Sequence, residues 1–321
     1  MAKKTTSKSN AKVSLNVNEL KDFNLIIFID SSLEDLVWKH RDKSNTRIYY
    51  HSKKDFSGKF FPFFDTIQFI RNDPNWYNQT SWLKDSTQGS LEYYNPMVMS
   101  KMFLLHNAKC YNPFDSEYFY WIDGGLNSTM SLGYFNNPMV INNLIKLSDN
   151  FLFIAFPYET SSEIHGFAID GMKKYCKNDN VNRVARGGFF GGHKNCISNA
   201  NNLYYSLLQD TLDDGYMGTE ESIFTIMTYL DPITYHYEMI EDNGLVYYFF
   251  EQLQKTDKKF GKKNETNLYL ITFNSPDQAR MVLSSFQKYD NDFIEKTNKI
   301  LINNSTNEST FEEYEIGRAH V

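Results

Sequence analysis

The sequence predicts an α/β protein in which a mainly parallel, twisted sheet is flanked by helices, with a short βαβ unit at the carboxyl end. Three observations predict this class. Strand-like runs alternate with helix-like segments over residues 24–230, a pattern typical of parallel sheets. The first strand-like run is continuously apolar, as expected of a strand covered on both faces. After a charged stretch at residues 255–266, the alternation begins again.

The first strand-to-helix unit follows a polar amino-terminal segment. Residues 1–17 are predicted to be a mobile tail, so the first domain is placed at residues 18–254. The run from Asn24 to Asp30 is apolar and ends in a carboxylate, and Ser31 and Ser32 then offer a helix cap. Thr46 to Tyr50 is predicted to be the next strand.

The rest of this domain continues the alternation. Helices are predicted at residues 62–69 and 96–106, each with a proline in or near its first turn, and at residues 199–212 and 219–230. Strands are predicted at residues 118–122 and 151–156. The glycine-rich segment 186–192 is predicted to be a strand or a loop.

The carboxyl-terminal part is predicted to begin a second domain. Residues 255–266 are interpreted as a linker, and residues 267–273 and 300–302 as strands around a helix that Ser275 and Pro276 begin. One βαβ unit cannot cover its own sheet, so residues 267–315 are interpreted as a truncated domain. Residues 316–321 match a translated sequencing adapter, typical of a metagenomic fragment, and the natural protein is expected to continue past Tyr314.

Composition narrows the function classes. The chain has 321 residues, a formal charge of -6 and a pI near 5.7, so no general basic field favours nucleic acid. Its three cysteines lack metal-ligand spacing and fit a reducing compartment. The longest apolar runs are too short to span a bilayer. We therefore expect a cytoplasmic protein with at most peripheral membrane association.

Residues 117–125, Glu-Tyr-Phe-Tyr-Trp-Ile-Asp-Gly-Gly, form the most informative segment. An aromatic run ends in the single carboxylate Asp123, which Gly124 and Gly125 follow. Open parallel sheets bind ligands at the carboxyl ends of their strands, and glycines let a ligand approach the backbone. Asp123 is therefore the predicted centre of the site, although a strand-end aspartate can also simply cap a turn.

Three segments carry a resemblance to a known family. They are residues 94–101 (Tyr-Asn-Pro-Met-Val-Met-Ser-Lys), residues 120–125, and residues 187–192 followed by residues 218–224 (Gly-Thr-Glu-Glu-Ser-Ile-Phe). On these segments the chain, over about residues 24–250, resembles the HtrL/YibB family, proteins linked to lipopolysaccharide synthesis and regarded as GT-A type glycosyltransferases. Residues 268–314 separately resemble the start of a glycosyltransferase family two domain.

The resemblance implies a GT-A-like sheet, a nucleotide-sugar donor, a glycan acceptor, and Mn²⁺ or Mg²⁺ at Asp123 with His236 as a further ligand. The chain differs in two ways from the pattern expected of the family, and both differences argue against assigning all of these properties to it. The additional strand with which the family opens is not found before Asn24. The usual metal motif has two acidic residues separated by one, whereas this chain has Asp123-Gly124-Gly125.

The remaining candidate residues each have a structural alternative. Glu220 and Glu221 are candidates for the catalytic base or a second metal ligand, but acids in a first helical turn are also favoured by the helix dipole. Arg186, Gly187 and Gly188 could place a cation and open backbone beside the donor, or form a close-packed glycine strand. The other candidates for the donor site are Lys101 and Arg41, which are commonly solvated, and Asp30, which can cap the next helix.

The leading hypothesis is a nucleotide-sugar-dependent glycosyltransferase acting on a surface or lipopolysaccharide-type glycan. The second is a catalytically silent glycan- or nucleotide-binding module, which the missing strand and the single aspartate favour. A third is a nucleotidyltransferase, which also uses strand-end acids and a metal.

Overall fold

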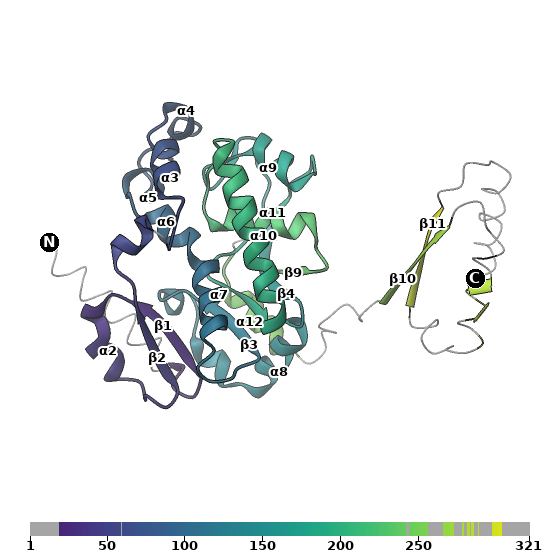
Figure 1. Ribbon diagram of the computed structural model, residues 1–321, viewed down its shortest axis with the longest axis horizontal. Helices are drawn as coiled ribbons and strands as arrows, with labels where there is room; N and C mark the ends of the chain where they lie inside the picture. The colour runs from purple at the N-terminus through teal and green to yellow at the C-terminus, as the bar shows by residue number, and fades with distance from the viewer. Residues whose placement is uncertain are drawn as a thin grey trace. The chain divides into compact units, whose positions relative to one another are not determined.

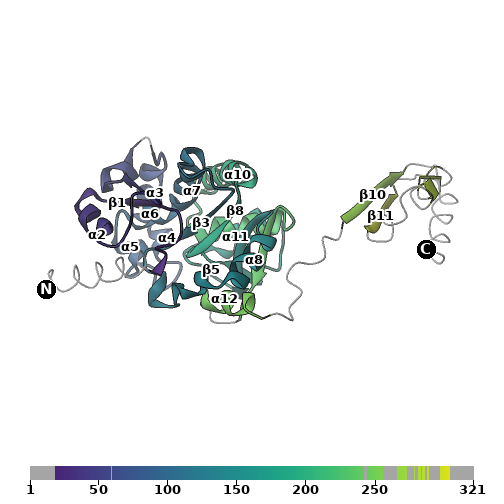
Figure 2. The same ribbon diagram turned by 90° about the horizontal axis from the view of Figure 1, so that it is seen from below.

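The computed structural model describes residues 19–58, 60–241, 244–255, 266–272 and 297–303, with a few helical positions between 278 and 288. The chain divides into two units, residues 1–258 and 259–321, and the division falls inside the segment predicted to be a linker. Figures 1 and 2 show the elements of each unit. The predicted tail at residues 1–17 and the adapter-like residues 316–321 lie outside the described residues.

The first unit begins with a small parallel sheet (Figure 1, purple). Strands β1 (Leu25–Ile29) and β2 (Thr46–Tyr50) pair in parallel with Leu25 opposite Thr46. Between them lie η1 (Ser31–Leu33) and α2 (Glu34–Trp38). The Asp30 carboxylate accepts a hydrogen bond from the Ser32 amide at 3.0 Å, which caps η1. This strand–helix–strand unit agrees with the sequence prediction.

Short helices then lead to the central sheet. They are η2 (Lys53–Ser57), α3 (Phe64–Arg71), α4 (Pro74–Tyr77), α5 (Thr87–Ser90), α6 (Tyr94–Met99) and α7 (Lys101–Tyr111). The helix predicted at residues 96–106 is therefore two helices, which meet at Ser100. Ser100 is fully buried and its hydroxyl donates to the Met97 carbonyl at 2.7 Å, a local bond that competes with the helical ladder.

The central sheet is mixed rather than mainly parallel, which corrects the sequence prediction. It contains β3 (Tyr118–Ile122), β4 (Phe151–Pro157), β7 (Arg183–Ala185), β8 (Phe189–His193) and β9 (Tyr235–Met239). In the described residues β8 runs antiparallel to both β3 and β4, β7 antiparallel to β4, and only β9 parallel to β4. The alternation of strands and helices along the sequence shows that helices connect the strands. It does not show whether each strand runs parallel or antiparallel to its neighbour.

Strands β7 and β8 behave as one strand with a bulge. Ala185 lies opposite Ala155 and Gly191 opposite Leu152, so this strand uses three more residues than β4 over the same distance. The Arg186 amide still donates to the Ile154 carbonyl at 2.7 Å. The extra residues fall at 186–188, the glycine-rich segment that the sequence singled out. Bulges of this kind re-aim side chains next to functional sites.

Helices cover the central sheet, and aromatic rings fill the space between. The remaining elements are η3 (Leu126–Ser128), η4 (Leu132–Asn136), α8 (Pro138–Leu147), β5 (Glu163–Ile164), β6 (Phe167–Ala168), α9 (Ile169–Cys176), α10 (Lys194–Asp213), α11 (Glu220–Leu230) and α12 (Tyr247–Leu253). Phe153, Phe190 and Phe224 are fully buried, and the Phe190 and Phe224 rings are 4.6 Å apart. Phe249 and Phe250 of α12 are also buried core residues, the common use of such a cluster.

The second unit contains the predicted parallel pair. Strands β10 (Thr266–Thr272) and β11 (Thr297–Asn303) pair in parallel with Thr266 opposite Thr297. The described positions between them, among them Gln278 and Lys288, are helical. Among the described residues of the whole chain, no helix combines the length and apolar character needed to cross a bilayer.

Candidate functional site

A buried ammonium group joins two of the predicted carboxylates. Lys101, the first residue of α7, donates from Nζ to Asp123 Oδ2 at 2.9 Å, to Glu220 Oε1 at 2.7 Å and to the Gly187 carbonyl at 3.2 Å. An ammonium group has three N–H donors, so the protein satisfies all of them. Lys101 is thus not a solvated surface residue: its side chain is only 10% exposed.

Asp123 is the member of this cluster that reaches solvent. Its side chain is 35% exposed, against 5% for Glu220. Its Oδ1 accepts from Trp121 Nε1 at 2.6 Å, and its amide donates to the Gly188 carbonyl at 3.1 Å, just beyond the last pair of β3 and β8. The strand end, the indole and Lys101 together fix the carboxylate at the sheet edge.

Glu221 forms a second buried cluster beside the first. Its Oε1 accepts from the Gly187 amide at 2.7 Å, while its Oε2 lies 3.0 Å from His165 Nδ1 and 3.3 Å from Arg186 Nη1. Glu220 and Glu221 begin α11, where the helix dipole favours acids. Thr219 occupies the N-cap position, but its buried hydroxyl makes no capping hydrogen bond.

His165 is the site residue that the sequence analysis missed. It lies with Gly166 in the two-residue turn between β5 and β6, and both residues have positive φ, 52° and 89°. Two-residue hairpin turns of the primed types require such angles. The available sequence signal was the short Glu-Ile-His-Gly-Phe pattern, but nothing local indicates that this hairpin reaches the start of α11.

The two glutamates have opposite pKa shifts. Burial raises the pKa of Glu220 to about 7, against the opposing charge of Lys101. Burial also opposes ionisation of Glu221, but the His165 hydrogen bond and the Arg186 charge outweigh it and lower the pKa to about 2. Burial lowers the pKa of His165, yet its bond to Glu221 produces a net increase. Neighbouring acids with divergent pKa values are a feature of acid–base sites.

Position 187 requires glycine because the Glu220 carboxylate lies close to its backbone. A Cβ atom at this position would lie 2.1 Å from Glu220 Oε1, so any side chain would displace the glutamate. Gly124 and Gly125 are different: both are exposed, and a Cβ atom there would meet nothing within 4 Å. Open space beside Asp123 agrees with room for a ligand at the end of β3.

The structure therefore gathers one group of the predicted residues, Lys101, Asp123, Arg186, Gly187, Gly188, Glu220 and Glu221. Others have separate local partners. Arg41 hydrogen-bonds the Leu20 and Phe23 carbonyls and Thr46, so it ties the chain before β1 to β2. Asp30 caps η1.

The late histidines also have local partners. His236 Nε2 lies 2.8 Å from Glu238 Oε1 on its own strand. His193 caps α10 by accepting a hydrogen bond from the Asn195 amide at 3.3 Å. Neither contact involves the carboxylate of Asp123.

The residues present do not fit a divalent cation as they are arranged. Both Asp123 oxygens are engaged, by Trp121 and Lys101, and Lys101 lies between Asp123 and Glu220 where a shared metal would bind. Within the described part of the chain, no group of three or more His, Cys, Asp or Glu residues could hold a metal ion. The cation between these carboxylates is the Lys101 ammonium group.

Fold and site together define a mixed α/β protein with a charged, partly solvent-exposed site at the carboxyl end of β3, which lies at one edge of the described central sheet. The chain belongs to the HtrL_YibB family, described as a bacterial protein of unknown function, whose model matches residues 16–251. No curated protein and no solved structure matches the chain.

Proposed function

We propose that the protein is a nucleotide-sugar-dependent glycosyltransferase of the GT-A type, which adds a sugar to a surface or lipopolysaccharide-type glycan. The observation that carries the proposal is the pair of carboxylates on Lys101. Asp123 is 35% exposed at a strand end, and buried Glu220 has a pKa of about 7. Such a site can bind a hydroxyl group and accept its proton near neutral pH.

In this proposal the acceptor hydroxyl attacks the anomeric carbon of the donor sugar. The new carbon–oxygen bond forms as the bond from that carbon to the diphosphate breaks, and the nucleoside diphosphate leaves with the electron pair. Asp123 takes the hydroxyl proton because it is the exposed carboxylate. Lys101 positions Asp123 through their ion pair. When Glu220 is protonated, Asp123 is the only negatively charged partner of Lys101 among these two carboxyl groups.

The leaving diphosphate requires a cation, and Arg186 is the cation of the site nearest to solvent. Its side chain is 30% exposed, against 10% for Lys101. Glu221 and the bulge at residues 186–188 fix its position, and Arg Nη and Nε groups suit bidentate contacts with phosphate. Glu221, held ionised by its partners, acts here as a positioning residue for Arg186 and His165.

The test is donor turnover. The purified chain is incubated with a panel of nucleotide sugars, with Mn²⁺ or with EDTA, and nucleoside diphosphate release is measured. We expect one donor to be turned over, and Asp123→Asn to lower kcat/KM by roughly 100-fold or more. Asp213→Asn, at the exposed end of α10, is the matched control and should match wild type. Equal rates for Asp123→Asn and wild type would refute the assignment.

A second candidate function is a silent nucleotide- or glycan-binding module. The observation that favours it is the closed ion network: all three Lys101 donors already have protein acceptors, as in a structural cluster. Calorimetry distinguishes the two functions. Donor affinity that Asp123→Asn weakens, with no product from any acceptor glycan, would support the binding module over the enzyme.

A further inference from the structure

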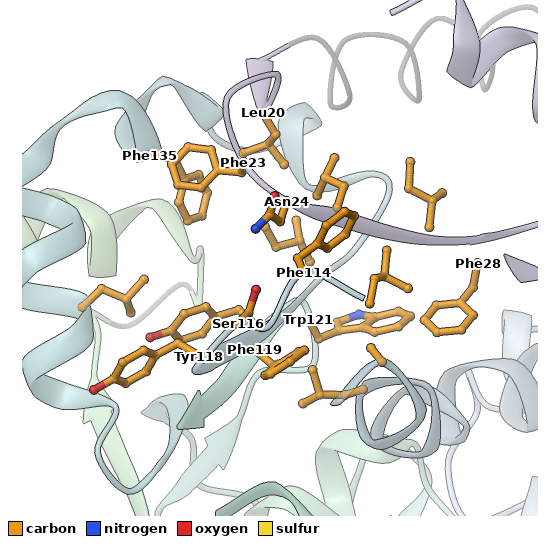
Figure 3. Close-up of a pocket in the computed structure, with 18 of the residues that line it drawn as sticks. Leu20, Phe23, Asn24, Phe28, Phe114, Ser116, Tyr118, Phe119, Trp121 and Phe135 are labelled. Atoms are coloured by element: carbon orange, nitrogen blue, oxygen red, sulfur yellow. The ribbon is translucent and has the colours of Figure 1, made fainter. Parts of the chain in front are cut away.

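An apolar cavity separates the small β1–β2 sheet from the central sheet. Its volume is about 500 Å³, and consecutive residues of two strands line it, residues 25–29 of β1 and residues 118–122 of β3 (Figure 3). Side chains alternate between the faces of a strand, so lining by consecutive residues means that the backbone edge itself faces the cavity.

The hydrogen bonds show which backbone groups of β1 point into the cavity. The Leu25 amide donates to the Asn45 carbonyl and the Ile29 carbonyl accepts from the His51 amide, so residues 25, 27 and 29 face β2. In a parallel pair of strands, the backbone N–H and C=O groups of the intervening residues point away from the partner strand. The N–H and C=O groups of Ile26 and Phe28 therefore face the cavity.

The same reasoning applies to β3. The Glu117 carbonyl accepts from the Lys194 amide and the Asp123 amide donates to the Gly188 carbonyl, so odd-numbered residues face β8. The groups of Tyr118, Tyr120 and Ile122 face the cavity. In the described part of the chain β1 pairs only with β2, and β3 only with β8. Two strand edges with unpaired hydrogen-bonding groups thus face a common cavity, an arrangement that is costly unless something pairs with them.

The walls of the cavity indicate what fits. Leu105 and Ala108 of α7, and Leu144 and Ile145 of α8, contribute to the lining, with Phe135 at one end. An occupant must therefore bring aliphatic side chains and also a backbone that pairs on both edges. An extended β-strand supplies both, whereas an acyl chain or small apolar ligand would leave the strand edges unsatisfied.

The chain itself carries a suitable segment directly before the described residues. Val13, Leu15 and Val17 alternate with polar or charged residues over residues 12–18, the period of a strand. Seven residues span about 23 Å in a strand, enough to cover the five-residue edges of β1 and β3.

The chain also enters the fold at the cavity. Leu20 is 4% exposed and lines it, and the adjacent Glu19 accepts from the Leu132 amide at 2.7 Å. Figure 3 shows Leu20, Phe23 and Phe135 at the end opposite Phe28 and Trp121. A segment that leads into Glu19 can therefore enter the cavity and turn back into β1, and its tether raises its effective concentration over any free partner.

We propose that residues 12–18 insert between β1 and β3 as a strand antiparallel to β1, which joins the two sheets into one. Residues 19–24 then form the hairpin loop. The insertion pairs the cavity-facing groups of Ile26 and Phe28 with one edge of the new strand, and those of β3 with the other. For residues 12–17 the proposal replaces the mobile tail predicted from the sequence, and it adds a strand before Asn24 that the sequence analysis did not find. It concerns the sheet and does not depend on glycosyl transfer.

Residue-resolved amide hydrogen exchange on the full chain tests the insertion. The cavity-facing amides are those of Ile26, Phe28, Tyr118, Tyr120 and Ile122, and the amides of Leu25 and Ile27, bonded to β2, serve as internal references. We expect Leu15→Asp, which places a charge among apolar walls, to lower protection of the cavity-facing amides by about tenfold or more while the references change little. Asn10→Asp, outside the segment, is the matched control and should change neither set.

A second measurement keeps the test decisive if Leu15→Asp weakens the whole protein. A chain lacking residues 1–18 should lose protection at the cavity-facing amides, and an added peptide of residues 11–18 should restore it. Protection that survives the deletion overturns the proposal. Protection that rises with protein concentration overturns it in favour of a second copy of the chain.

Discussion

Replacing Glu220 by glutamine tests the electrostatics of the site through stability. Burial raises the pKa of this carboxyl from its ordinary 4.5 to about 7. The folded protein then binds more protons than the unfolded chain between these two pH values, so the free energy of unfolding falls as pH rises through this window. A shift of this size corresponds to about 3 kcal/mol, and Glu220 is buried, so solvent screening is slight.

The assay is urea unfolding of wild type and Glu220→Gln at several pH values between 4.5 and 8. Glutamine cannot ionise, so the variant lacks this pH dependence. We expect the stability of wild type relative to the variant to decrease by about 3 kcal/mol from pH 4.5 to pH 8. Other titrating groups contribute to both proteins and largely cancel in the difference.

Glu221 and Lys101 do not contribute to the decrease in stability between pH 4.5 and 8 that we attribute to Glu220. The pKa of Glu221 is lowered to about 2, so its contribution is complete above pH 4.5 and is lost only at lower pH. The pKa of Lys101 is raised above its ordinary 10.5, so its contribution is lost only in strong base. Asp213→Asn is the control for the loss of an acid. A difference between wild type and Glu220→Gln that stays constant from pH 4.5 to 8 would refute the raised pKa of Glu220.

Four further predictions follow from single contacts. Gly187→Ala should destabilise the protein by about 1–3 kcal/mol in urea unfolding, because its Cβ would lie 2.1 Å from Glu220 Oε1, whereas Gly124→Ala should change little. Phe224→Ala should cost about 3–5 kcal/mol in the same assay, because this ring is fully buried against Phe190. Donor affinity measured by calorimetry should be the same in Mn²⁺ and in EDTA, because Lys101 lies between the carboxylates; a strong dependence on the cation would contradict that reading. In thiol titration, exposed Cys110 should react quickly and Cys176 slowly, because burial raises the pKa of the Cys176 thiol to about 12.

Much of the site was predictable from sequence because its residues stand at the ends of elements. Asp123 follows a strand and Glu220 begins a helix, and strand ends and helix starts are visible as changes in pattern. The roles were less visible. From the sequence, Lys101 and Arg41 each fitted either a phosphate-binding cation or a solvated surface residue. In the structure Lys101 lies between two carboxylates, and Arg41 donates to backbone carbonyls.

The direction of the central strands could not be predicted. The sequence predicts a strand or a loop at the glycine-rich segment 186–192, and a strand that runs in either direction has the same pattern. The bulge at residues 186–188 depends on the register between β8 and β4, and this register joins residues about 40 positions apart. His165 likewise reaches Glu221 from a hairpin 56 positions earlier in the chain.

The sequence by itself determined several of the strands and helices and which residues stand at their ends, because propensity and periodicity are local properties of the chain. Only the tertiary structure decided which of those residues meet, that a lysine joins two of the acids, and that the edges of β1 and β3 face one cavity. These features depend on burial and on contacts between distant segments, and the free energy of a buried charge is set by neighbours that no local pattern contains.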